Sequence, residues 1–157
     1  MFNKILVCLD GSAMAEKVLP FAIEQARHFE SEMVLFRVIH EPSIISLAIP
    51  GMPAVAMDTP GQERQIKSEE LESETYLKNL SESIQAKEGI AVSYDQTLGT
   101  PGEAIVDYTA DNAIELIAIA THGRSGPGRT VLGSVADYII RNAGLPILLI
   151  RPTKEKK

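Results

Sequence analysis

The sequence contains a single cysteine, Cys8, and no tryptophan among its 157 residues. A lone cysteine excludes an intramolecular disulfide and a cysteine-rich metal site, and it fits a reduced cytosolic setting. Because Cys8 lies in an apolar run, we expect a buried and unreactive thiol. No apolar run reaches the roughly 20 residues that span a membrane, and residues 1–4 lack the features of a signal peptide. These absences predict a soluble cytoplasmic protein without a membrane segment.

Positive charge is also scarce. The chain has 15 lysines and arginines against 21 aspartates and glutamates, for a net charge of −6 at pH 7. A surface that binds nucleic acid or an anionic membrane needs a basic face, so we expect neither partner. His28 and His40 have no metal-ligand spacing with each other or with Cys8, so a metal site built from protein side chains is not expected. Small molecules and other proteins remain as partners.

What the chain does contain is a regular alternation of apolar runs and helical patterns. Its 45% apolar content is typical of one domain, which we place at residues 1–152, followed by a flexible tail at 153–157. Strands are predicted at 4–9, 32–39, 90–98, 116–120 and 147–150. Helices are predicted at 12–29, 62–87, 100–112 and 134–142. The alternation predicts an α/β fold with a single, doubly wound five-stranded parallel sheet.

Local signals mark several helix ends. Ser12 is predicted to cap the first helix, in which Pro20 predicts a bend or a local irregularity. Residues 100–103 are predicted to form a capping box with a proline at the first helical position. The segment 41–61 contains four prolines, which prevent a long regular helix or strand. This Pro-rich loop is either a variable flap or partner surface, or it packs on the helix that follows.

The most informative stretch joins the strand 116–120 to the last helix through a glycine-rich loop. Ser134 is predicted to be the N-cap of that helix, with Asp137 favourable to the helix dipole. Backbone N–H groups at such a turn bind phosphate, although a glycine-rich loop is also an ordinary connector. No lysine precedes Ser134, and no G-x-G-x-x-G motif follows the first strand, so the standard phosphate-binding fingerprints are absent.

Residues 121–126, the nine residues between Gly123 and Gly133, and the sequence Gly133-Ser134-Val135 resemble the nucleotide loop of ATP-binding universal stress proteins. The pattern of that family is Gly, two residues, Gly, nine residues, Gly, and Ser or Thr. This chain follows the pattern except at the first position, where Ala120 replaces glycine. The resemblance implies that the extra methyl group lies near the ribose, where it would weaken ATP binding or favour a shorter nucleotide.

The resemblance also covers Asp10 after the first strand and the closing segment 146–150, so it spans nearly the whole chain. It implies the strand order 3-2-1-4-5 with helices on both faces of the sheet. It further implies a site for an adenine nucleotide, ATP or AMP, at the carboxyl ends of the strands. The nucleotide-binding residues implied in this way are Cys8, Asp10, Val38, Ile119, Ala120, Thr121, Gly123, Arg124, Gly133, Ser134 and Val135.

The resemblance assigns roles to some of these residues. The backbone of Val38 would meet the edge of the adenine, although a plain core valine explains the same pattern. Asp10 would contact the ribose or a phosphate-bound Mg, whereas the residues alone favour a simple turn former. Gly123 and Gly133 let the backbone approach phosphate oxygens. Arg124 either contributes positive charge for phosphate or faces solvent.

No residue pattern in the chain suits fast phosphoryl transfer, since the loop has no lysine and His122 has no spaced partner. We therefore predict a nucleotide-binding stress-response or signalling protein with at most slow hydrolysis, whose occupancy tunes conformation or partner binding. The alternatives are a nucleotide-free homodimeric adaptor with a structural loop, and an adenylyl-transferring enzyme on a related fold. A homodimer is expected through the strand 147–150, which is short, apolar and at a sheet edge. Other protein partners are not identified by the sequence.

Overall fold

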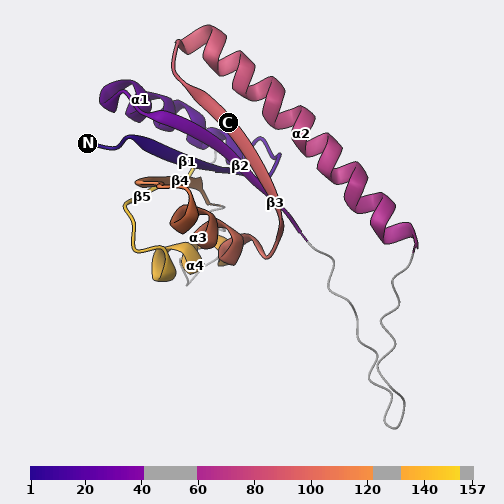
Figure 1. Cartoon of the computed structure of the whole chain (residues 1–157). Helices are drawn as coiled ribbons and strands as arrows, with labels where there is room; N and C mark the ends of the chain where they lie inside the picture. Colours follow the sequence, from indigo (N-terminus) through magenta and orange to yellow (C-terminus); the bar gives the residue numbers. More distant parts are fainter. Residues whose placement is uncertain (41–59, 122–131, 153–157) are drawn as a thin grey trace, which may run out of the picture.

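The computed structural model describes residues 1–40, 60–121 and 132–152, which form one parallel sheet with helices on both faces (Figure 1). The strands are β1 (Lys4–Leu9), β2 (Glu32–His40), β3 (Val92–Gly99), β4 (Leu116–Ala120) and β5 (Ile147–Ile150). Their order is β3-β2-β1-β4-β5, and every neighbouring pair is parallel. The predicted fold class and strand order are therefore confirmed.

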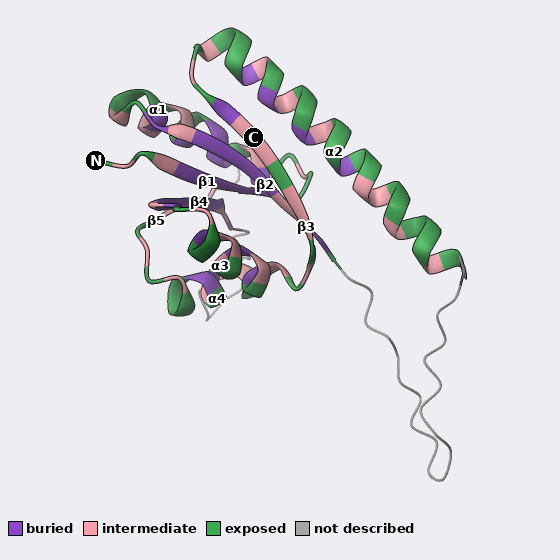
Figure 2. Ribbon diagram, viewed as in Figure 1, coloured by how far each residue is buried: buried purple, intermediate pink, exposed green. Residues whose placement is uncertain are grey.

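The central strand, β1, is buried on both faces. Ile5, Val7 and Leu9 belong to the core beneath α1 (Leu19–Phe29) and α2 (Pro60–Glu88). Leu6 and Cys8 belong to the core beneath α3 (Pro101–Asp111) and α4 (Ser134–Asn142). Because side chains alternate along a strand, one nearly continuous apolar run supplies both halves of the core. Figure 2 shows the buried central strands between helices whose outer faces are exposed.

The first helical segment is divided at the position where the proline predicts an irregularity. A 3₁₀ turn, η1 (Ala15–Val18), precedes α1, and Pro20 lies in the first turn of α1. A proline is tolerated there because the N–H group it lacks has no intrahelical partner. Ser12 accepts a hydrogen bond from the Ala15 N–H, with 3.1 Å from N to Oγ. The predicted bounds of one helix over 12–29 were therefore wrong, since η1 comes first and α1 begins at Leu19, but Ser12 does accept the hydrogen bond expected of a capping residue.

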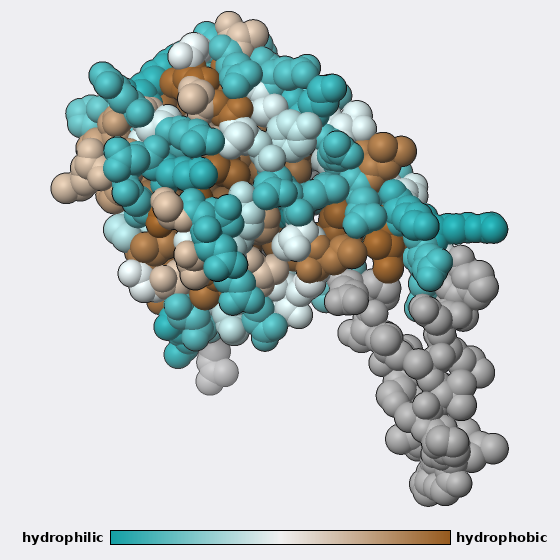
Figure 3. All heavy atoms as spheres, viewed as in Figure 1, coloured by the Kyte–Doolittle hydropathy of each residue, from teal (hydrophilic) through white to brown (hydrophobic). Residues whose placement is uncertain are grey.

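The longest helix, α2, has 29 residues and buries only a narrow stripe of them. Its fully buried side chains include Ser73 and Leu77, which face the sheet. Hydrophilic residues cover much of the surface seen in Figure 3. The helix begins at Pro60, so the predicted loop 41–61 ends two residues too late. Residues 41–59 lie outside the described structure, and both interpretations of that loop stay predictions.

Two further findings concern the helices. α3 begins at Pro101 as predicted, but the Thr100 side chain makes no capping hydrogen bond, so the predicted capping box was wrong. The α3 helix starts instead with the backbone bond from the Ala104 N–H to the Thr100 carbonyl, at 2.9 Å. In the part of the chain that the structure describes, no helix combines the length and the apolar content needed to cross a bilayer.

Candidate functional site

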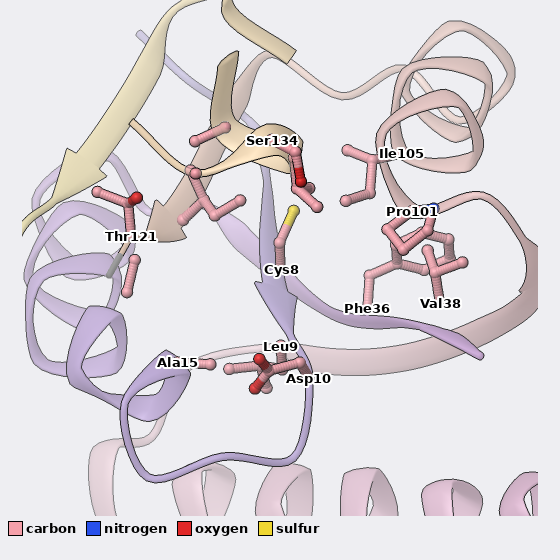
Figure 4. A pocket seen from close by; sticks show the side chains of 15 residues that line it. Cys8, Leu9, Asp10, Ala15, Phe36, Val38, Pro101, Ile105, Thr121 and Ser134 are labelled. Atoms are coloured by element: carbon pink, nitrogen blue, oxygen red, sulfur yellow. The ribbon is translucent and has the colours of Figure 1, made fainter. Parts of the chain in front are cut away.

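A pocket of about 330 Å³ opens at the carboxyl ends of β1, β2 and β4 (Figure 4). This is the point at which the winding of the sheet reverses, because β1 lies between β2 and β4. The lining includes nine residues of the predicted site: Cys8, Asp10, Val38, Ile119, Ala120, Thr121, Gly133, Ser134 and Val135. The other two, Gly123 and Arg124, lie outside the described residues. Residues from strands far apart in the chain therefore meet in one crevice.

Sequence reasoning missed the other lining residues, which are Leu9, Ala15, Phe36, Pro101, Ile105 and Ala136. One signal was available for Phe36, because it lies two residues before Val38 and therefore on the same face of β2. No comparable local signal places Pro101 or Ile105 beside β2, since their position depends on how α3 packs.

One end of the pocket is an apolar slot, lined by Phe36, Val38, Pro101 and Ile105. Phe36 is 1% exposed and stacks on Tyr108 of α3 with 4.1 Å between the ring centroids. Burial, together with the neighbouring Asp95 carboxylate, raises the pKa of Tyr108 to about 12, so its ring stays uncharged. The slot therefore suits a flat, uncharged group that stacks on or slides between apolar side chains.

Cys8 lies between the apolar slot and the start of α4. It pairs with Phe36 across β1 and β2, and 6% of its surface is exposed. Burial raises the pKa of the Cys8 thiol to about 12, because the thiolate would lose its hydration. Cys8 is therefore a neutral thiol at physiological pH, which excludes it as a ready nucleophile.

The raised pKa of Cys8 predicts a loss of stability at alkaline pH. In the unfolded chain the thiol ionises near its ordinary pKa of 9.0, whereas in the folded chain it stays protonated up to about 12. Its contribution is complete below pH 9 and is lost as the pH rises toward 12, by about 1.4 kcal/mol per unit. Urea unfolding at pH 8 and pH 10 should show a larger loss for the wild type than for Cys8→Ala. Parallel losses in the two proteins would contradict the prediction.

Asp10 lies at the mouth of the pocket in the turn after β1. Its Oδ1 accepts a hydrogen bond from the Ser12 N–H at 2.9 Å, so the turn-forming role is present. Gly11, at φ 83°, lies against the guanidinium group of Arg37. The turn therefore holds Asp10 beside the pocket, where its carboxylate adds negative charge. Within the described ranges, no group of three or more His, Cys, Asp and Glu side chains converges on a metal position.

The other end of the pocket is the start of α4. The N-cap is Gly133, and no side chain caps the helix, so the prediction of Ser134 as the N-cap was wrong. Ser134 is instead the first helical residue. The N–H groups of the first residues have no acceptor within the helix and carry its positive dipole end. Asp137, in the first turn, accepts a hydrogen bond from Arg141 at 2.9 Å.

Nearly the whole chain matches a known family. The family model of the universal stress protein family covers residues 1–151. This chain belongs to the universal stress protein family. Among its relatives, universal stress protein YxiE of Bacillus subtilis is 28% identical over 152 residues, which is 96% of this chain and 100% of YxiE.

Solved universal stress proteins share the fold. UspA from Lactobacillus plantarum superposes with a TM-score of 0.76 at 20% identity, covering 95% of this chain and 97% of UspA. A member from Arabidopsis thaliana with AMP bound has a TM-score of 0.66 at 13% identity, covering 98% of this chain and 94% of the Arabidopsis chain. Another member, in complex with cAMP, has a TM-score of 0.65 at 15% identity, covering 96% of this chain and 97% of that member's chain. At these identities the likeness demonstrates a common fold.

Proposed function

We propose that this universal stress protein binds an adenine nucleotide, ATP or AMP, in the pocket, and that occupancy tunes its conformation or its contacts with partners. The observation that carries the proposal is the meeting of an apolar slot and an uncapped helix start in one pocket. A nucleotide has the same division, with a flat base at one end and an anion at the other. The AMP-bound and cAMP-bound members of the family support the choice of adenine.

Each part of the ligand has a complementary part of the pocket. The adenine would lie in the slot, with its edge near the backbone of Val38. The ribose would lie between Asp10 and Ala120, at the ends of β1 and β4. The first phosphate would meet the backbone N–H groups at the start of α4. Any Mg²⁺ would be held chiefly by phosphates and water, with Asp10 as its carboxylate ligand, because Mg²⁺ commonly binds nucleotides in this way.

The lining is better suited to binding than to chemistry. No lysine, arginine or histidine lines the pocket among the residues that the structure describes. The Cys8 thiol stays protonated, because burial raises its pKa to about 12. Asp10 already accepts a hydrogen bond from its own turn. We therefore propose hydrolysis that is slow at most, with nucleotide occupancy as the signal.

Calorimetric titration tests the proposal with AMP, ATP, cAMP and, as a base control, GMP. We expect saturable binding of at least one adenine nucleotide and weaker binding of GMP. Ser134→Ala should weaken that binding by up to about tenfold, because one hydroxyl at the phosphate end is lost. Ser68→Ala on the exposed face of α2 is the matched control and should bind as the wild type does. Absence of binding by every adenine nucleotide would favour the nucleotide-free adaptor.

We also propose a homodimer that forms through β5. This strand is at the edge of the sheet, and all four of its residues are partly exposed. Such an apolar edge pairs readily with a second copy of itself. Sedimentation equilibrium at micromolar concentration should give the mass of two chains. A monomer mass across that range would contradict the proposal.

A further inference from the structure

Thr121 combines a fixed backbone with a hydroxyl group that has no hydrogen-bond partner within the described ranges. Its N–H donates to the Ile150 carbonyl at 2.9 Å, which extends the pairing of β4 with β5 by one residue. The residue is 5% exposed. Its hydroxyl oxygen has no hydrogen-bond partner among the residues that the structure describes. A buried hydroxyl without a partner costs free energy, and such groups in native proteins commonly mark a ligand or a bound water.

The buried hydroxyl lies close to the start of α4. Thr121 lines the pocket from the end of β4 (Figure 4). A Cβ atom at Gly133 would lie 3.3 Å from Thr121 Oγ1, so the hydroxyl is close to the N-cap of α4. The hydroxyl does not cap the helix, since no side-chain hydrogen bond is made there. Thr121 therefore adds one more donor to the unpaired N–H groups of the first turn.

The Thr121 hydroxyl and the free N–H groups at the start of α4 favour a ligand group that accepts hydrogen bonds. The N–H groups can only donate, the hydroxyl can donate as well as accept, and the helix dipole favours negative charge at the same place. The carboxylate nearest in sequence, Asp137, is already paired with Arg141. A phosphate oxygen satisfies the donors together, whereas the 5′-hydroxyl of a free nucleoside carries no charge and offers a single oxygen.

We propose that the Thr121 hydroxyl donates to the ligand's first phosphate group and makes this site prefer nucleotides to free nucleosides. The inference rests on the proposed nucleotide-binding function and adds a specificity-determining side chain to it. Gly133 has no side chain between the hydroxyl and the helix start, so both contact the same phosphate. Thr121 thereby distinguishes ligands with a phosphate from ligands without one, whatever base they carry.

The test compares AMP with adenosine in wild type, Thr121→Val and Thr121→Ser by calorimetric titration. Valine has nearly the shape of threonine without the hydroxyl, and serine restores the hydroxyl. We expect the wild type to prefer AMP, and valine to reduce that preference by about tenfold or more, as loss of a charged hydrogen bond does. Serine should retain most of the preference. An equal preference in the wild type and Thr121→Val would overturn the proposal.

The stability of the ligand-free protein provides a second readout. If the hydroxyl makes its hydrogen bond only to the ligand, Thr121→Val should not lower the thermal midpoint of the ligand-free protein, because the substitution removes a polar group that has no partner there. A lower thermal midpoint in Thr121→Val that is restored in Thr121→Ser would show that the hydroxyl forms a hydrogen bond within the protein. That result would overturn the proposal. A wild type that binds adenosine and AMP equally refutes only this inference. A wild type that binds neither of these ligands, nor ATP or cAMP, refutes the proposed function as well.

Discussion

Replacing Gly133 with valine is expected to abolish nucleotide binding while the sheet stays folded. Gly133 is the N-cap of α4 at φ 20°, and a Cβ atom there would lie 3.3 Å from Thr121 Oγ1. A branched side chain would therefore occupy the space between the end of β4 and the helix start, which the first phosphate needs. We expect the affinity for AMP to fall by more than about 100-fold, which corresponds to roughly 3 kcal/mol. Calorimetric titration measures the change.

Gly144→Val is the matched control for Gly133→Val. Gly144 also has a positive φ, of 61°, so valine strains the backbone there as well. No atom of the described residues lies within 4 Å of a Cβ at Gly144, and this residue does not line the pocket. The control should therefore lose stability and retain nucleotide affinity. If both variants lose affinity alike, the effect of Gly133→Val is general strain and not a blocked phosphate position.

Phe36→Ala is expected to cause a large loss of stability. Phe36 is 1% exposed, lies in the core between β2 and α3, and stacks on Tyr108 at 4.1 Å. Its removal leaves a cavity beneath the pocket, and such substitutions cost about 3–5 kcal/mol. For a chain of this size the thermal midpoint should fall by roughly 6–20 °C. Differential scanning calorimetry of the ligand-free protein gives the value.

A second aromatic residue provides the comparison for Phe36→Ala. Phe21 lies on α1 and is 50% exposed, so Phe21→Ala removes the same atoms from a site already in contact with water. It should cost less than about 1 kcal/mol, because little apolar area returns to water and little cavity forms. Equal losses at the two positions would contradict the assignment of Phe36 to the core. Phe36→Ala should also weaken AMP binding, because the slot loses its stacked wall.

The two variants separate the two ends of the pocket. Gly133→Val acts on the helix start and should reduce affinity far more than Gly144→Val does, although valine strains the backbone at both positions. Phe36→Ala acts on the apolar slot and should change both affinity and stability, because the slot is part of the core. Because one end of the site is a helix start and the other is part of the core, the ratio of lost affinity to lost stability should differ between Gly133→Val and Phe36→Ala. A fragment of the ligand extends the comparison. Adenine, which has no phosphate, should bind to Gly133→Val more tightly than AMP binds to the same variant.

Much of the site was accessible from sequence because parallel strands end at the same edge of a sheet. Cys8 and Asp10 end β1, Val38 is near the end of β2, and Ala120 ends β4. Once the order of strands is known, these positions must be neighbours. The family pattern of glycines supplied that order, and the observed sheet has it. Short-range patterns also placed the irregularity near Pro20, because a proline removes its donor wherever it occurs.

Helix starts were less predictable. Thr100 and Ser134 are residue types that commonly cap helices, yet neither side chain makes a capping bond. Composition indicates that a helix begins nearby, whereas the exact cap depends on the backbone angles of a single residue. At α4 the chain turns into the helix at Gly133, one residue earlier than expected. That shift leaves the first N–H groups without a side-chain cap and therefore available to a ligand.

The sequence by itself determined the alternation of strands and helices, the central position of β1 and the family to which the chain belongs. These follow from periodicity and motif spacing, which are properties of residues close together in the chain. Only the tertiary structure decided that Phe36 and Ile105 line the pocket and that the Thr121 hydroxyl, beside Gly133, has no partner in the described part of the chain. Both depend on distances between elements far apart in sequence, because packing of α3 and α4 against the sheet sets which polar atoms are satisfied. A local pattern records burial along the chain but not which atom lies opposite.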